Sequence, residues 1–78
     1  MAIKLSELAM GQHAKIISYQ DISPGHRKKL LAMGLLPQTL IQYVRAAPFG
    51  DPMQIKASNI NIALRKPLAD KIMVEVNQ

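Results

Sequence analysis

Residues 53–64, which read MQIKASNINIAL, decide the class of the fold. Apolar and polar side chains alternate in Met53–Ala57, and they alternate again in Ile60–Leu64. This period of two is typical of a strand with one face buried and one face exposed. Ser58 and Asn59 lie between the two runs and favour a tight turn. The segment therefore predicts two short strands joined by a turn.

Three further segments have the character of strands, which brings the expected number to five. They are the isoleucine-rich His13–Tyr19, then Thr39–Ala47, and finally Ile72–Val76, which again alternates. A few short strands in an open sheet leave exposed edges, and such edges invite aggregation. Closing the strands on themselves solves this problem, so we predict an all-β, SH3-like, five-stranded antiparallel barrel. An OB-fold is the alternative, although its helix normally comes later in the chain.

One helix is predicted as an insertion after the first of these five strands. Ser23 is a good N-terminal cap, and Pro24 suits the first helical position, where its missing N–H costs nothing. Gly34 is suited to end the helix, which should therefore span residues 24–33. Single helical turns are also predicted at 6–11, capped by Ser6, and at 67–71.

The segment Pro48–Pro52 is predicted to form a rigid turn between the second and third of these strands. Its two prolines limit the unfolded ensemble, and Gly50 is expected at positive φ. Phe49, one of only three aromatic residues besides the histidines, lies within this turn.

Because aromatic residues are scarce, the core should be aliphatic. Leu30, Leu31 and Leu35 are expected to be buried in it. Leu36 lies just before a proline and is expected to be exposed. Three methionines also occur where core residues belong: Met33, Met53 and Met73.

The 78 residues allow a single domain, 1–78, with one core. The sequence contains no cysteine, which excludes a disulfide scaffold, a thiolate zinc site and a cysteine nucleophile. No segment approaches the roughly 20 apolar residues that span a bilayer, and the N-terminus does not read as a signal peptide. We therefore expect a cytoplasmic protein that reaches a membrane through another molecule.

Residues that support catalysis or metal binding are few and dispersed. His13 and His26 lie in no recognisable catalytic triad, and the five carboxylates are scattered along the chain. Neither histidine has a second histidine at helical spacing or an acidic cluster beside it, as a ferrous iron site would favour. A GxxxxGK[ST] phosphate loop is also absent from the sequence. We therefore expect no enzyme activity, no cofactor and no tight metal site.

Ten basic residues face five acidic ones, which gives a formal net charge of +5. The basic residues gather in Arg27–Lys29 and in the smaller pair Arg65-Lys66. This balance suits nucleic acid, an anionic lipid surface or an acidic protein partner, although a short charge run is usually a solvated face. Binding of bases needs exposed aromatic side chains, of which few are available. A small basic barrel that binds nucleic acid is therefore the alternative function.

Four motifs follow one another along nearly the whole chain. They are Leu5–Leu8 with Gly11, LLAMGLLP at 30–37, RAAPFGDP at 45–52, and IALR at 62–65 followed by Ala69. Together, in this order and spacing, they resemble the ferrous iron transport protein A family (FeoA). The chain departs from the family pattern at three places: Met10 where proline is frequent, Gln38 where glycine is usual, and 58–60 where a Gly-Tyr pair is usual.

The resemblance implies an SH3-like fold and a non-enzymatic accessory role in bacterial ferrous iron uptake. It also implies contact with FeoB, the membrane transporter that carries a cytosolic GTPase. A basic helix beside an exposed leucine would combine electrostatic steering with an apolar anchor. The candidates for binding this partner are Arg27, Lys28, Lys29, Leu36, Phe49, Arg65 and Lys66.

Overall fold

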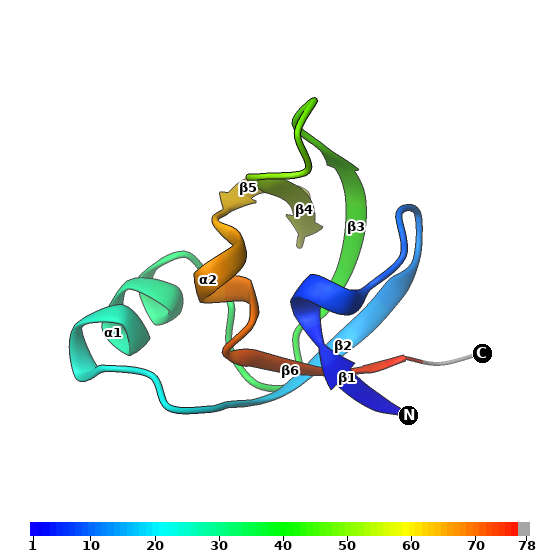
Figure 1. Cartoon of the computed structure of the whole chain (residues 1–78). Helices are drawn as coiled ribbons and strands as arrows, with labels where there is room; N and C mark the ends of the chain where they lie inside the picture. Colours follow the sequence, from blue (N-terminus) through cyan, green and yellow to red (C-terminus); the bar gives the residue numbers. More distant parts are fainter. Residues whose placement is uncertain (77–78) are drawn as a thin grey trace.

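The computed structural model describes residues 1–76, and these form one antiparallel sheet with three short helical segments (Figure 1). The strands run in the order β1-β6-β2-β3-β4-β5 across the sheet, so β1 and β5 are its two ends. These two strands are not paired with each other, so the barrel predicted from the sequence is not closed among residues 1–76. The strands are β1 (Ala2–Lys4), β2 (His13–Tyr19), β3 (Leu40–Ala46), β4 (Met53–Ala57), β5 (Ile60–Leu64) and β6 (Ile72–Val76). The helical segments are the 3₁₀ turn η1 (Leu5–Glu7), α1 (Pro24–Ala32) and α2 (Lys66–Ala69).

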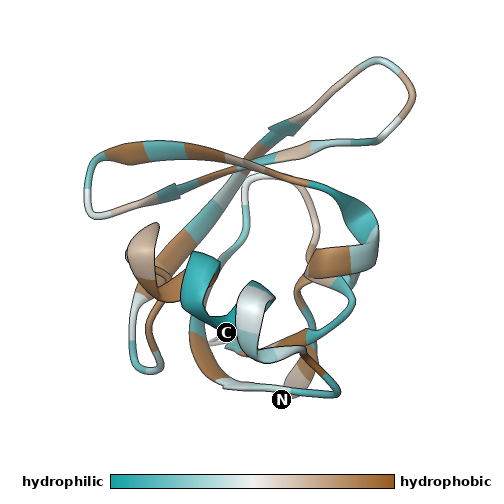
Figure 2. Ribbon diagram, turned by 90° about the vertical axis from the view of Figure 1, so that its left-hand side faces the viewer, coloured by the Kyte–Doolittle hydropathy of each residue, from teal (hydrophilic) through white to brown (hydrophobic). Residues whose placement is uncertain are grey.

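The hairpin β4–β5 has the structure expected from its alternating sequence. Ala57 pairs with Ile60, and Ser58 and Asn59 both have positive φ, at 49° and 69°. Two central residues with positive φ give a turn whose twist matches that of the flanking strands. Figure 2 shows hydrophobic and hydrophilic residues alternating along the strands. The buried hydrophobic side chains form the core.

The sheet curves because two of its strands carry irregularities in register. The register of β2 against β6 shifts between Ile16 and Ser18, and that of β3 against β4 shifts between Tyr43 and Arg45. Such bulges bend a strand and increase its twist. The bent sheet wraps around an aliphatic core that includes Ile16 and other fully buried side chains: Leu5, Leu30, Leu35, Ile55, Ile72 and Val74.

The expected number of five strands is too low, because the structure has a sixth strand, β1, at the N-terminus. Ile3 in β1 pairs with Val74 of β6. Three residues are too few to show a period of two, and their partner lies at the other end of the chain. The helical turn expected at 6–11 lies instead at Leu5–Glu7. Lys4 takes the capping position assigned to Ser6, and its N–H donates to Glu7 Oε1 at 3.0 Å.

Helix α1 begins and ends close to where the sequence predicts. Ser23 Oγ accepts the N–H of His26 at 3.2 Å, as expected of an N-terminal cap. At the other end, Gly34 has a φ of +85° and donates to the carbonyl of Leu31, while Leu35 donates to that of Leu30. These two bonds make a Schellman motif. Because Leu30 and Leu35 are both fully buried, the motif also fixes the end of α1 to the core.

Two of the residues expected in the core lie outside it. Leu31 is 41 % exposed, because one step along a helix turns the side chain about 100° away from the buried face of Leu30. Met73 is half-buried on the face of β6 opposite Val74, as the period of two requires. Met53 is buried as expected, and Met33 is partly buried against the core.

Gln38, the residue that stands where the family usually has glycine, has a φ of +76°. Left-handed backbone is costly for a residue with a Cβ atom, which gives a physical reason for the usual glycine. The N–H of Gln38 donates to the carbonyl of Ile16 at 2.6 Å. This bond ties the turn after α1 to β2.

Among residues 1–76, no helix has the length and apolar character required to cross a membrane.

Candidate functional site

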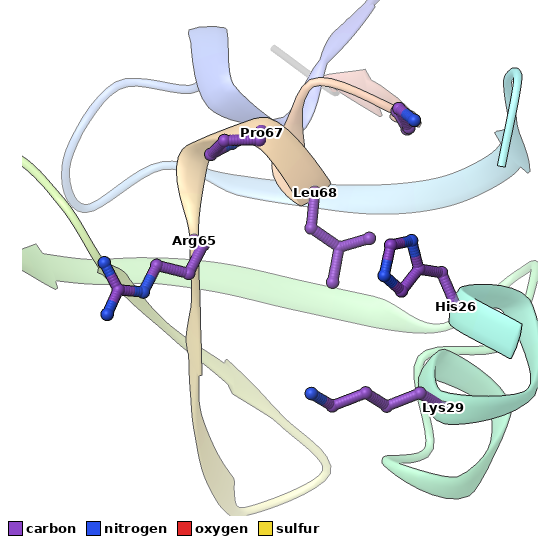
Figure 3. Close-up of a pocket in the computed structure, with 6 residues that line it drawn as sticks. His26, Lys29, Arg65, Pro67 and Leu68 are labelled. Atoms are coloured by element: carbon purple, nitrogen blue, oxygen red, sulfur yellow. The ribbon is translucent and has the colours of Figure 1, made fainter. Parts of the chain in front are cut away.

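A cleft of about 270 Å³ lies between α1 and α2, two helices that are far apart in the sequence (Figure 3). His26 and Leu68 point towards each other across it, and Lys29 extends from α1 into the same gap. The guanidinium of Arg65 points away from α1. Exposed or half-buried side chains line the cleft: His26, Lys29, Arg65, Pro67, Leu68 and Lys71.

Both walls of the cleft are attached to the core. Ala69 of α2 is fully buried, and its N–H donates to the carbonyl of Arg65 at 3.0 Å. Beyond α1, the hydroxyl of Tyr19 donates to the carbonyl of Leu35. Burial raises the pKa of Tyr19 above its ordinary value of 10.0, against the opposing effect of the Arg27 charge. The phenol therefore stays a proton donor near neutral pH and helps to hold the end of α1.

The cleft carries positive charge, and the carboxylates of residues 1–76 neutralise little of it. Within residues 1–76 a single ion pair is found, between Arg65 and Asp51 at 3.9 Å. Lys29 and Lys71 have no carboxylate oxygen of this part of the chain within 4.0 Å. A concave surface lined by one sign of charge concentrates the electrostatic field and attracts ligands of the opposite charge.

The turn Pro48–Pro52 lies against the start of α2. Asp51 Oδ1 accepts the N–H of Lys66 at 2.8 Å, in addition to the ion pair of Asp51 with Arg65. The positive φ predicted for Gly50 is confirmed at +85°, and its N–H donates to the carbonyl of Ala47 at 2.7 Å. The structure thus connects the turn around Phe49, whose side chain is 98 % exposed, with Arg65-Lys66.

The basic run on α1 does not form one surface. Lys29 lines the cleft towards α2, whereas Arg27 lines a separate hollow with Tyr19 and Pro37. Lys28 is exposed and lines neither of these hollows. Leu36 is 46 % exposed, as the sequence predicts, and Leu31 is similarly exposed. The candidates for partner binding therefore face in more than one direction.

Sequence reasoning missed several residues of this site. His26, Leu68 and Lys71 line the cleft, and Asp51 links the turn to α2. The helical turn predicted at 67–71 was an available signal, because residues three apart lie on the same helical face and Leu68 and Lys71 have that spacing. No local pattern indicates Asp51, whose hydrogen-bond partner is 15 residues away.

The part of the chain that the structure describes holds no group of three or more His, Asp or Glu side chains suited to bind a metal ion. His13 and His26 are both exposed. The expected absence of a tight iron site remains a prediction, which a titration with ferrous iron can test.

Residues 3–76 match the model of the family described as the FeoA domain. Over 74 residues the chain is 35 % identical to a Fe(2+) transport protein A/Fe(2+) transporter FeoB fusion protein of Porphyromonas gingivalis. That match covers 95 % of this chain but only 9 % of the relative, so the chain corresponds to a small part of the fusion protein.

Solved structures with a similar fold include two proteins described as FeoA or iron(II) transport protein A. The iron(II) transport protein A of Clostridium thermocellum is 44 % identical, with a TM-score of 0.89 over 95 % of this chain and 45 % of that one. The FeoA of Stenotrophomonas maltophilia, solved with zinc and described as an SH3 domain protein, is 25 % identical, with a TM-score of 0.81 over 94 % of this chain and 89 % of that one. These matches confirm the SH3-like fold, and together with the family model they show that the chain belongs to the FeoA family.

Proposed function

We propose that this protein is a non-enzymatic accessory protein of bacterial ferrous iron uptake. In this proposal it acts in the cytoplasm, docks on the GTPase-bearing part of a FeoB-like transporter and modulates it. The observation that carries the proposal is the fused relative, which joins a region similar to this chain with FeoB in one polypeptide. Fusion raises the effective concentration of one module at the other, which benefits two modules that work in contact.

The surface of the protein offers groups of the kind that anchor protein interfaces. Phe49 is almost fully exposed on a turn that is held at both ends, so little entropy is lost when it binds. Aromatic side chains are enriched among residues that dominate binding energy. The basic residues Lys29 and Arg65 would steer the protein towards an acidic surface and speed association.

Binding between purified proteins tests the proposal. The full chain is titrated into the isolated cytosolic GTPase part of the transporter and, separately, into the detergent-solubilised transporter, with calorimetry as the readout. We expect saturable binding to both, and a higher affinity at low salt because exposed charges are screened at high salt.

Two results would count against docking. The first is the absence of binding to either form of the transporter. The second is tight binding to a single-stranded RNA, with a steep loss of affinity as salt rises, which would favour the nucleic-acid alternative. An RNA titration by filter binding belongs in the same experiment for this reason.

A further inference from the structure

The cleft between α1 and α2 combines two unpaired ammonium groups with an apolar wall. Lys29 of α1 and Lys71, in the turn after α2, both line it, and neither has a carboxylate oxygen of residues 1–76 within 4.0 Å. Pro67 and Leu68 supply the apolar part of the lining. A ligand that satisfies both parts must itself carry a negative charge next to an apolar group.

Two carboxylates next to α2, those of Asp51 and Asp70, bond to groups other than Lys29 and Lys71. Asp51 bonds to the N–H of Lys66 and pairs with Arg65. Asp70, at the end of α2, accepts a hydrogen bond from the hydroxyl of Ser6. The positive charge of the cleft is therefore available to a partner.

The size and lining of the cleft favour protein side chains over a nucleotide. Its volume of about 270 Å³ lies below the roughly 300–1,000 Å³ of pockets that hold drug-sized ligands. Its lining holds His26 and Arg65, which can stack on a base, but none of the larger Phe, Tyr or Trp platforms. Because α1 and α2 are both attached to the core, the cleft is formed before the partner arrives, which lowers the entropic cost of binding.

We propose that this cleft receives an acidic segment of the transporter, with carboxylates facing Lys29 and Lys71 and a neighbouring apolar side chain against Leu68. The inference rests on the proposed function and adds the chemistry of the segment that is recognised. It assigns the main electrostatic contact to Lys29 and Lys71 and leaves Arg27 and Lys28 outside it.

A peptide titration tests the cleft without the transporter. The probe is the capped hexapeptide Glu-Asp-Leu-Glu-Asp-Leu, and its control replaces each acid by the corresponding amide. Amide resonances of the isotope-labelled full chain should shift around His26, Lys29, Leu68 and Lys71 with the acidic peptide alone. Equal shifts with both peptides, or shifts confined to other surfaces, would overturn the inference.

Charge reversals then relate the cleft to the transporter. Lys29→Glu and Lys71→Glu each lower the net charge from +5 to +3, and so does the matched control Lys56→Glu on β4. We expect each cleft variant to weaken binding of the peptide and of the GTPase part by about tenfold, and the control to weaken it by less than about twofold. Circular dichroism verifies that all three are folded.

The outcomes separate the two proposals. If wild type binds the transporter and the cleft variants bind equally well, the acidic segment is refuted while docking stands. If the peptide binds in the cleft but the transporter does not bind, docking fails while the chemistry of the cleft stands. If single-stranded RNA or phosphatidylglycerol vesicles shift the same resonances at lower concentration than the peptide does, the cleft belongs to a different class of partner and the inference is wrong.

Discussion

Replacing Asp51 by alanine tests how the turn around Phe49 is held against α2. Asp51 Oδ1 accepts the N–H of Lys66 at 2.8 Å. Lys66 is the first residue of α2, and Arg65 before it makes no side-chain capping bond. Asp51 therefore acts as a helix cap that comes from a distant segment. Removal of a capping oxygen typically costs about 1 kcal/mol, within a range of roughly 0.5–2 kcal/mol.

The ion pair between Asp51 and Arg65 should add little to this value. Its atoms are 3.9 Å apart, and the two side chains are 36 % and 78 % exposed. Exposed pairs contribute between about 0 and 1 kcal/mol, and a long, solvated pair belongs at the lower end. We therefore expect Asp51→Ala to lower the free energy of unfolding by about 1 kcal/mol. For a domain of this length that corresponds to a fall in melting temperature of about 4–8 °C.

The assay is thermal and urea unfolding of three variants, followed by circular dichroism. Asp51→Asn keeps an acceptor oxygen, so it should lose less than half as much stability as Asp51→Ala. Arg65→Ala removes the ion pair alone, so its effect should stay below about 0.5 kcal/mol and shrink at high salt. The capping argument is refuted if Asp51→Ala melts within about 1 °C of wild type. It is equally refuted if Arg65→Ala costs as much as Asp51→Ala.

Four further predictions concern single positions and metal binding. Tyr19→Phe should cost about 1 kcal/mol near neutral pH, because it removes a hydrogen bond. Burial raises the pKa of Tyr19 in the folded state. Its contribution to the free energy of unfolding is therefore full below pH 10.0 and is lost as the pH rises through the folded pKa. Unfolding curves measured at increasing pH should show this loss in wild type and not in the variant. Gln38→Gly should raise the free energy of unfolding by up to about 1 kcal/mol, and with it the melting temperature, because glycine adopts a φ of +76° without strain. A lower melting temperature would contradict the strain argument. Phe49→Ala should weaken transporter binding by at least about tenfold in calorimetry without lowering stability. Ile60 is also apolar and exposed, and Ile60→Ala should leave the affinity unchanged. Equal effects of the two substitutions would show that Phe49 is not an anchor. Anaerobic calorimetry with ferrous iron should show no stoichiometric binding at micromolar concentration, and a signal lost on replacing either histidine would refute this.

The hairpin β4–β5 and helix α1 could be predicted because their signals are local. Alternation within five residues defines each strand of the hairpin, and the two turn residues accept positive φ. Ser23 and Gly34 mark the ends of α1 through hydrogen bonds that span only a few residues. Signals of this kind are fully contained in a short window of sequence.

The structural features that the sequence does not predict depend on contacts between residues that are far apart in the chain. Strand β1 exists because Ile3 pairs with Val74, at the opposite end of the sequence. The sequence does not show that Leu31 is exposed, because a pair of adjacent leucines does not indicate which of the two faces the core. The direction of the buried face of α1 is set by Leu30 and Leu35 together, through the bond that closes the helix.

The arrangement of the basic residues in space could not be predicted for the same reason. A run such as Arg27–Lys29 is conspicuous in a sequence, but consecutive helical residues point in different directions, and the structure places only Lys29 of this run in the cleft. The residues that meet around α2 come from three separate segments: Asp51 caps its start, Leu68 forms one wall of the cleft, and Lys29 reaches in from α1. A four-residue helix therefore connects the exposed Phe49 on one side with the basic cleft on the other. A partner that contacts both would need an apolar pocket and an acidic segment on one face, and this requirement is stricter than attraction to a basic helix.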